Sequence, residues 1–169
     1  MKKAVWGVLS ATVALALAGV GTTATVRAQH SPSGEVAAQF QPSRADGHGE
    51  FPIGTDHHVG QFSFAVTAGR TGPEGSFEFN ELNKPRHVVE HIVLRPVDHV
   101  AIVGHTAHIE GATLWHNRHA RVRVIATDDG EHHDSLSIRV TAAEGTDAGK
   151  VLYAVEGVLT SGAIHVYAH

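Results

Sequence analysis

Apolar and polar residues alternate in short segments along the C-terminal two thirds of the chain. Phe62, Phe64 and Val66 alternate with polar or small residues, and a turn with Gly and Pro at 71–75 separates them from a second alternating segment at 77–80. Successive side chains of a β-strand point to opposite faces of the sheet, so a period of two predicts strands with one buried face. The two segments together predict a β-hairpin.

Further apolar segments rich in β-branched residues follow, each closed by Pro, Gly or a charged turn. They cover residues 88–94, 97–103, 106–109, 112–115, 121–126, 136–140, 151–155 and 164–168. The pattern predicts eight or nine short strands, and no amphipathic segment of helix length separates them, which excludes most βαβ folds. We therefore expect an all-β, single-domain fold, either an antiparallel β-sandwich or a small β-barrel.

The N-terminal segment at 1–28 has the pattern of a secretory signal peptide. Two lysines precede an apolar segment at 4–21, and Val26 and Ala28 occupy the −3 and −1 positions of a cleavage site. We expect cleavage after Ala28 and a secreted, extracellular protein with no membrane span afterwards. The alternative is an uncleaved membrane anchor, because the apolar segment is nearly long enough to span a bilayer.

The segment at 29–55 contains Pro, Gly, Ser and charged residues without a sustained period. This composition predicts a flexible leader. The all-β domain is then expected at 56–169.

Composition narrows the classes of function. The chain has 169 residues, no Cys, 15 His and a net charge of −4 with His neutral. The lack of Cys excludes a disulfide scaffold, a cysteine-ligated metal and a thiol nucleophile. The basic residues are scattered along the sequence, which argues against a nucleic-acid partner.

Four short segments carry a resemblance to a known family. They are residues 60–64 (GQFSF), 109–111 (IEG), 127–131 (TDDGE) followed by Asp134, and 159–166 (LTSGAIHV). With them, the chain from about residue 54 to 167 resembles the bacterial secreted post-COAP domain. The resemblance implies an all-β extracellular domain without an established activity. His132 and His133 depart from the small turn expected there, and residues 167–169 extend past the usual end.

The histidines are candidate metal ligands. Neutral imidazole binds Zn and Cu, and a site needs two to four converging nitrogens. His116 and His119 flank a predicted turn at 116–118 whose arms would bring both rings together, and His165 is the next candidate. No His spacing matches HExxH or a zinc finger, so a solvated, His-rich surface or a pH-responsive surface remains the alternative.

An acidic turn offers a second, weaker candidate for a metal site. Asp128, Glu131 and Asp134 supply oxygen ligands suited to Ca²⁺, and Gly130 allows a tight loop. The spacing is not that of an EF-hand. An ordinary polar β-turn is the alternative, because Asp and Gly are common turn residues.

Catalytic motifs are weak in this sequence. No G-x-S-x-G segment is present, and with this many histidines a Ser–His–Asp combination is expected by chance. Glu78 and Glu81 would serve glycoside chemistry only if the fold placed them at a suitable separation. Trp115, Tyr153 and Tyr167 would either stack on a carbohydrate or pack within the fold.

The sequence as a whole favours a secreted, non-enzymatic β module with a binding or structural role. Its partner would be an extracellular ligand or a component of the cell surface. A His-rich protein that binds Zn or Cu is the first alternative, and a small secreted enzyme whose site forms only in three dimensions is the second. The oligomeric state stays open.

Overall fold

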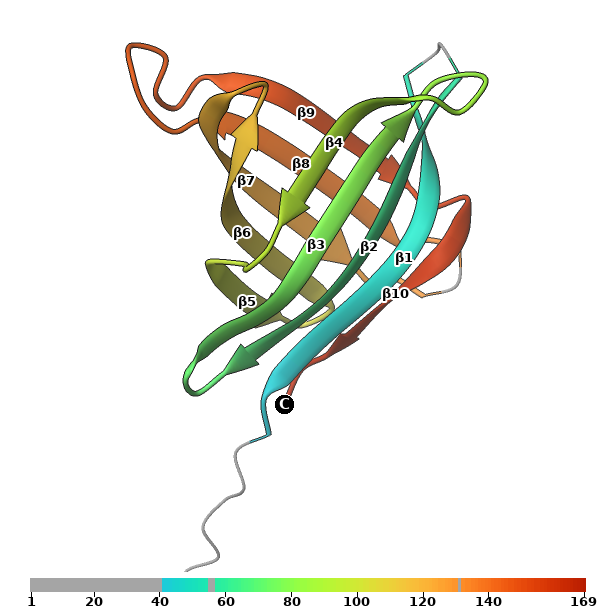
Figure 1. The fold of residues 1–169 in the computed structure, drawn as a ribbon. Coiled ribbons are helices and arrows are strands. Elements are labelled where there is room, and N and C mark those ends of the chain that lie inside the picture. The colour runs from blue at the N-terminus through green and yellow to red at the C-terminus, as the bar shows by residue number, and fades with distance from the viewer. Residues whose placement is uncertain (1–40, 55–56, 131) are drawn as a thin grey trace, which may run out of the picture. The chain divides into compact units, whose positions relative to one another are not determined.

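A computed structural model describes residues 41–54, 57–130 and 132–169, and these residues form ten β-strands without a helix (Figure 1). The strands are β1 (Ser43–Ile53), β2 (His58–Gly69), β3 (Gly72–Leu82), β4 (Val88–Leu94), β5 (His99–Val103), β6 (Thr106–Trp115), β7 (Arg118–Thr127), β8 (Ser135–Ala142), β9 (Val151–Val158) and β10 (Ser161–Tyr167). The predicted all-β class is confirmed.

The strands form two antiparallel sheets of five strands each. The first sheet has the order β10-β1-β2-β3-β4, and the second sheet has the order β5-β6-β7-β8-β9. Each sheet is a meander of hairpins, except that the last strand of the chain, β10, returns to pair with β1 (Figure 1). The two sheets are arranged like a sandwich.

The buried faces of both sheets share one apolar core. The first sheet contributes Phe51, Phe62, Phe64, Phe77, Phe79, Ile92 and Leu94, and the second contributes Ile109, Trp115, Val122, Val124, Leu136, Ile138 and Val140. In β2, β3 and β7 these residues are every second position, as the alternation predicts. Burying one such side chain stabilises the fold by about 1.5–3 kcal/mol.

The ring of Phe51 links the two sheets through close contact with glycine backbone. A Cβ atom at Gly60 in β2 would lie 2.7 Å from Phe51 Cζ, and one at Gly157 in β9 would lie 2.5 Å from Phe51 Cδ2. The ring is fully buried. Only residues without a side chain allow β2 and β9 to approach the ring this closely.

The prediction of a flexible leader at 29–55 is wrong for its C-terminal part. Residues Ser43–Ile53 form β1, which lies between β10 and β2 in the first sheet. The alternation was hidden because two of the inward positions of β1 are Gly47 and Gly49, which have no side chain to register as apolar. The domain therefore includes Ser43 and does not begin at residue 56.

A second difference concerns β6. The segments at 106–109 and 112–115 were expected as separate strands, but they form one continuous strand through Gly111. Leu94 of the first sheet fills the space beside this glycine, where a Cβ atom would lie 3.0 Å from Leu94 Cδ2. The predicted turn at 116–118 is confirmed, since β6 ends at Trp115 and β7 begins at Arg118.

Some expectations fall outside the described residues. These are the signal peptide at 1–28, the first part of the leader at 29–40 and Glu131 of the acidic turn. In the ranges that are described, no helix has the length and apolar character needed to cross a membrane.

We predict that Gly60→Ala destabilises the protein by about 1–3 kcal/mol, because the added methyl group overlaps the rings of Phe51 and Phe79. Urea denaturation of the variant and the wild type measures this loss. Gly69→Ala at the end of β2 is the comparison and should cost less, since its Cβ atom would meet one atom, the oxygen of Gly72 at 3.2 Å, and no ring of the core. Equal losses for both variants would contradict the proposed contact.

Candidate functional site

Three adjoining hollows form a shallow groove on the outer face of the first sheet, which we call the polar groove. The largest has a volume of about 570 Å³ and adjoins a second of about 280 Å³ through Ser63 and Glu78. A third, of about 350 Å³, adjoins the second through Ala65. The shared residues place the three hollows next to one another along the strands.

Short outward side chains explain why this face is hollow. Ser63 and Ala65 of β2 and Ser76 of β3 alternate with buried phenylalanines, so they point away from the core. Ala65 lies opposite Ser76, and Ser63 lies opposite Glu78. The backbone of two central strands thus forms the floor of the groove.

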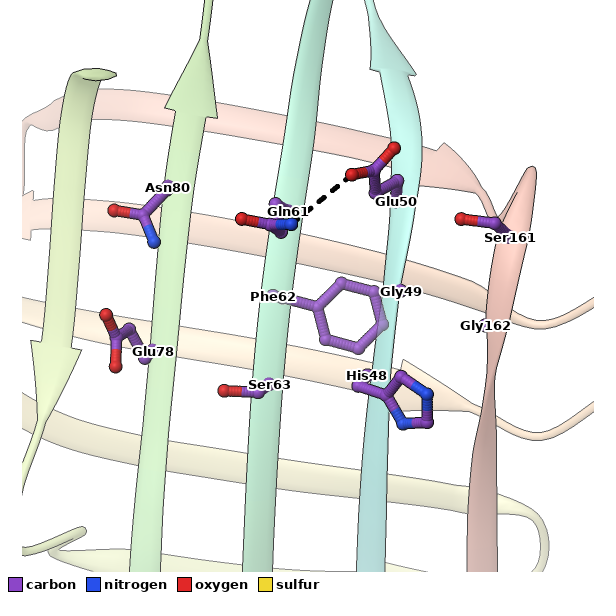
Figure 2. A pocket seen from close by; sticks show the side chains of 10 residues that line it. All are labelled: His48, Gly49, Glu50, Gln61, Phe62, Ser63, Glu78, Asn80, Ser161 and Gly162. Atoms are coloured by element: carbon purple, nitrogen blue, oxygen red, sulfur yellow. Dashed lines mark hydrogen bonds between the residues drawn. The ribbon is translucent and has the colours of Figure 1, made fainter. Parts of the chain in front are cut away.

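Longer polar side chains border the groove in a row that crosses the whole sheet. The row contains one residue from each strand, in register from β10 to β4: Ser161, Glu50, Gln61, Asn80 and His91. Figure 2 shows the side chains of Glu50, Gln61, Asn80 and Ser161 side by side on their strands. Adjacent strands are about 4.8 Å apart, so the row offers hydrogen-bonding groups over about 19 Å.

Hydrogen bonds position the carboxylate in this row. Gln61 Nε2 donates to Glu50 Oε1 at 3.3 Å, drawn as a dashed line in Figure 2. Arg86 Nη1 donates to the same oxygen at 3.2 Å. In the neighbouring row, Glu78 Oε1 lies 3.4 Å from His91 Nε2. Glu50 and Glu78 therefore each have a partner on a neighbouring strand.

A second group of polar side chains, which we call the carboxylate cluster, points toward the inside of the sandwich. Glu81 of β3 and Glu90 of β4 are directly opposite each other. His58 Nδ1 lies 2.5 Å from Glu81 Oε1, and His116 Nε2 lies 2.9 Å from Glu90 Oε2. Tyr153 Oη donates to Glu81 Oε2 at 2.7 Å. Like charges on paired strands repel, and each carboxylate here has its own partner.

The environment of Tyr153 keeps its phenol protonated. Burial raises the pKa of Tyr153 well above its usual value, and the hydrogen bond to Glu81 and the charges of Glu81 and Glu90 add to the effect. A protonated phenol is a donor, so it holds Glu81 in place. Because β2 and β3 belong to the first sheet and Tyr153 to the second, the cluster connects the two sheets.

The structure does not bring the predicted histidine ligands together. His116 and His119 flank the β6–β7 turn as expected, but they face different carboxylates: His116 lies 2.9 Å from Glu90 and His119 4.0 Å from Glu144. His165 lies in the first sheet, on β10. Nowhere in the described part of the chain do three His, Asp or Glu side chains form a group able to hold a metal ion.

The carboxylates of the acidic turn instead accept hydrogen bonds from the edge of β10 that does not pair with β1. Asp134 Oδ2 accepts a hydrogen bond from the backbone nitrogen of Ile164 at 2.7 Å, and Asp128 Oδ2 accepts one from that of Val166 at 3.1 Å. Asp134 Oδ1 also accepts a bond from the nitrogen of Asp129 at 3.1 Å, and the residue is only 6% exposed. These two carboxylates therefore satisfy strand-edge donors that would otherwise lack partners.

The aromatic candidates separate into two groups. Trp115 and Tyr153 pack together inside the sandwich with ring centroids 5.2 Å apart. Tyr167 is exposed on β10, with the guanidinium of Arg44 4.4 Å from its ring centroid. Trp115 and Tyr153 therefore pack within the fold, as one of the two alternatives predicted.

Sequence reasoning missed most of the carboxylate cluster, although a signal was present. Phe77, Phe79 and Glu81 share one alternating pattern, and Glu90, Ile92 and Leu94 share another. A carboxylate in phase with core residues is a buried charge that needs partners. The row that borders the polar groove has no comparable signal, because the sequence does not show which exposed polar residues of different strands lie opposite each other.

We predict that Asp134→Asn lowers the free energy of unfolding by about 2–3 kcal/mol. The carboxylate accepts from the backbone nitrogens of Asp129 and Ile164, and in the amide an NH₂ group would face one of these two N–H donors and leave it without an acceptor. Asp129→Asn, at an exposed side chain, is the control and should change stability by about 0.5 kcal/mol or less. Urea denaturation measures both. Ca²⁺ should leave the melting temperature of the wild type unchanged; a rise that Asp134→Asn abolishes would support the calcium site instead.

We also predict that Tyr153 makes stability fall with pH in alkaline solution. Above about pH 10 an unfolded tyrosine releases its proton, whereas folded Tyr153 keeps it, so unfolding becomes more favourable. The wild type should lose up to about 1.4 kcal/mol per pH unit more than Tyr153→Phe in that range. Chemical denaturation from pH 9 upward measures the two slopes, and parallel slopes would contradict the assignment.

The chain matches no protein-family model, no curated protein and no solved structure. Its function is therefore inferred from the geometry of its own residues.

Proposed function

We propose that this protein is a secreted, non-enzymatic binding module that holds an extended, hydroxyl-rich ligand, such as a neutral polysaccharide, in the polar groove. The observation that carries the proposal is the succession of three neighbouring hollows along the outer face of the first sheet. A long, shallow and open groove fits a chain better than it fits a compact small molecule, which is usually enclosed.

The chemistry of the groove supports a hydroxyl-rich ligand. A hydroxyl group both donates and accepts, so it pairs with side chains that do either. Glu50 and Glu78 are acceptors, Gln61 and Asn80 offer both functions, and Ser63 adds a hydroxyl group. All of these residues are on strands, so binding orders little additional backbone.

The carboxylate cluster supports a binding role over a catalytic one. Both oxygens of Glu81 already have partners, His58 and Tyr153. Tyr153 is held protonated by its raised pKa, so it is a poor base. The inward carboxylates thus have a structural use, which leaves the groove as the better candidate for function.

We also propose the finer fold and the family. A sandwich is favoured over a closed barrel, because in the described ranges the sheets meet through side chains, as at Asp134, and not through a backbone ladder. The resemblance to the post-COAP domain gains support from the same residue. Two of its motif segments meet there, since Asp134 binds the nitrogens of Leu159 and Ile164.

The test is binding of neutral hexasaccharides from cellulose, xylan, chitin and starch, measured by isothermal titration calorimetry with the purified protein. At least one should bind with a Kd below about 1 mM. Ser63→Tyr places a bulky side chain in the groove and should weaken binding at least about tenfold, which is about 1.4 kcal/mol.

Ser137→Tyr is the matched control, because Ser137 points outward from the middle of the second sheet, away from the groove. It should bind like the wild type. The proposal fails if none of the glycans binds, or if both tyrosine variants bind as well as the wild type.

A further inference from the structure

Three arginines gather on the outer face of the second sheet. Arg121 and Arg123 occupy outward positions of β7, and Arg139 occupies an outward position of β8. Arg123 and Arg139 are directly opposite each other in the register. With Glu110 and Thr141 the arginines line a hollow of about 300 Å³, which we call the arginine hollow.

This arrangement is unfavourable for the protein alone. Like charges directly opposite each other on paired strands destabilise a sheet. The chain has a net charge of −4 and only 13 Lys and Arg residues, so a group of three on one face is a local reversal of its overall charge. A bound anion would relieve the repulsion between Arg123 and Arg139.

Nearby carboxylates neutralise the arginines only in part. Glu110 Oε1 accepts a hydrogen bond from Arg123 Nε at 2.7 Å, which leaves the terminal nitrogens of that guanidinium. Asp98 Oδ2 lies 3.8 Å from Arg121 Nη1, beyond hydrogen-bond distance. Arg139 has no ion pair with any carboxylate in the described residues. Donors on all three arginines are thus free for a ligand.

Small neighbours keep the arginine hollow open. Ala112 lies beside Arg121 in the register, and Ala154 lies beside Arg139. Glu156, the next outward residue of β9, is opposite Ser137 and not opposite an arginine. A ligand therefore reaches the guanidinium groups without displacing a large side chain.

We propose that the arginine hollow binds the oxyanion groups, sulfate or carboxylate, of an acidic extracellular polysaccharide. A planar guanidinium matches the geometry of such groups with two parallel hydrogen bonds. Strands about 4.8 Å apart allow Arg123 and Arg139 to hold one oxyanion from two sides. The open face of a sheet also leaves room for a polymer to continue past the hollow.

This site is separate from the polar groove. The groove lies on the outer face of the first sheet, and the arginine hollow lies on the outer face of the second. The groove is lined by more carboxylates than guanidinium groups, with Arg44 and Arg95 beside four Asp and Glu residues, whereas the hollow has three arginines and one glutamate. Ser63→Tyr, which blocks the groove, should leave binding at the hollow unchanged.

The test uses the purified protein and four probes: a heparin hexasaccharide, a hexamer of galacturonate, a neutral dextran of similar length and a DNA hexamer. Isothermal titration calorimetry gives the Kd of each at low and high NaCl. The sulfated or the uronate probe should bind at the hollow, and any dextran binding should belong to the groove, so it should be lost in Ser63→Tyr and kept in Arg139→Gln. High salt should weaken binding at least about tenfold, because exposed charges are screened.

Arg139→Gln should weaken the binding of the anionic glycan at least about tenfold. Arg70→Gln, in the β2–β3 turn of the first sheet, removes the same charge elsewhere and should have no effect. Arg139→Gln should melt at the same temperature as the wild type or higher, since it removes a repulsion. If Arg139 had a purely structural role, its substitution would lower the melting temperature.

Three results would overturn the proposal. The first is equal binding by Arg139→Gln and the wild type, and the second is no binding of either acidic probe. The third is tighter binding of DNA than of the glycans, which would identify a nucleic-acid surface. The two proposals fail independently. Ser63→Tyr should lose the binding of neutral glycans and keep the binding of the acidic glycan at the arginine hollow.

Discussion

The buried carboxylate of Asp134 ties the edge of the first sheet to the segment that leads into β8 of the second sheet. It belongs to the start of the β8 segment, yet it binds the backbone nitrogen of Ile164 in β10, at the edge of the other sheet. An edge strand presents unpaired donors, and a buried donor without a partner costs as much as a lost hydrogen bond. The backbone oxygen of Asp134 also accepts from Leu159, at the crossover between the sheets. One residue thus binds both the crossover and the free edge of β10, while the ladder with β1 holds the other edge of β10.

At the opposite edge of the first sheet, a side chain of the second sheet likewise binds the backbone of the edge strand. Thr113 Oγ1 of β6 donates to the backbone oxygen of Val93 in β4 at 3.2 Å. The carboxylate cluster joins the sheets through Glu81 of β3 and Tyr153 of β9, and in the core Phe51 packs against glycines of both sheets. Because inward or edge-facing groups make all of these contacts, the outer faces of both sheets are left free for ligands.

The sequence predicted strands where inward positions carry large apolar residues, and it failed where they do not. β2, β7 and β8 have clear alternation, whereas β1 places Gly47 and Gly49 toward the core, so its sequence has the pattern of a leader. Similarly, the acidic turn was identified but its use was not. Nothing in the sequence around Asp134 says that the partner of its carboxylate is a backbone nitrogen 30 residues later in the chain. The polar groove and the arginine hollow depend on register between strands, which only the fold establishes.

The division of charge between the two outer faces follows from this construction. Glu50, Glu74 and Glu78 point outward from the first sheet, and three arginines point outward from the second. Alternate residues of a strand point away from the core, so an outward charge stays in water and costs little desolvation. The fold therefore allows each outer face to carry a different set of charged residues. The groove of the first sheet also contains Arg44 and Arg95, and the hollow of the second contains Glu110, so the two faces differ in the balance of charge. If the two proposed sites bind a neutral and an acidic chain, the contacts between the two sheets, including the one at Asp134, set the separation of the two ligands.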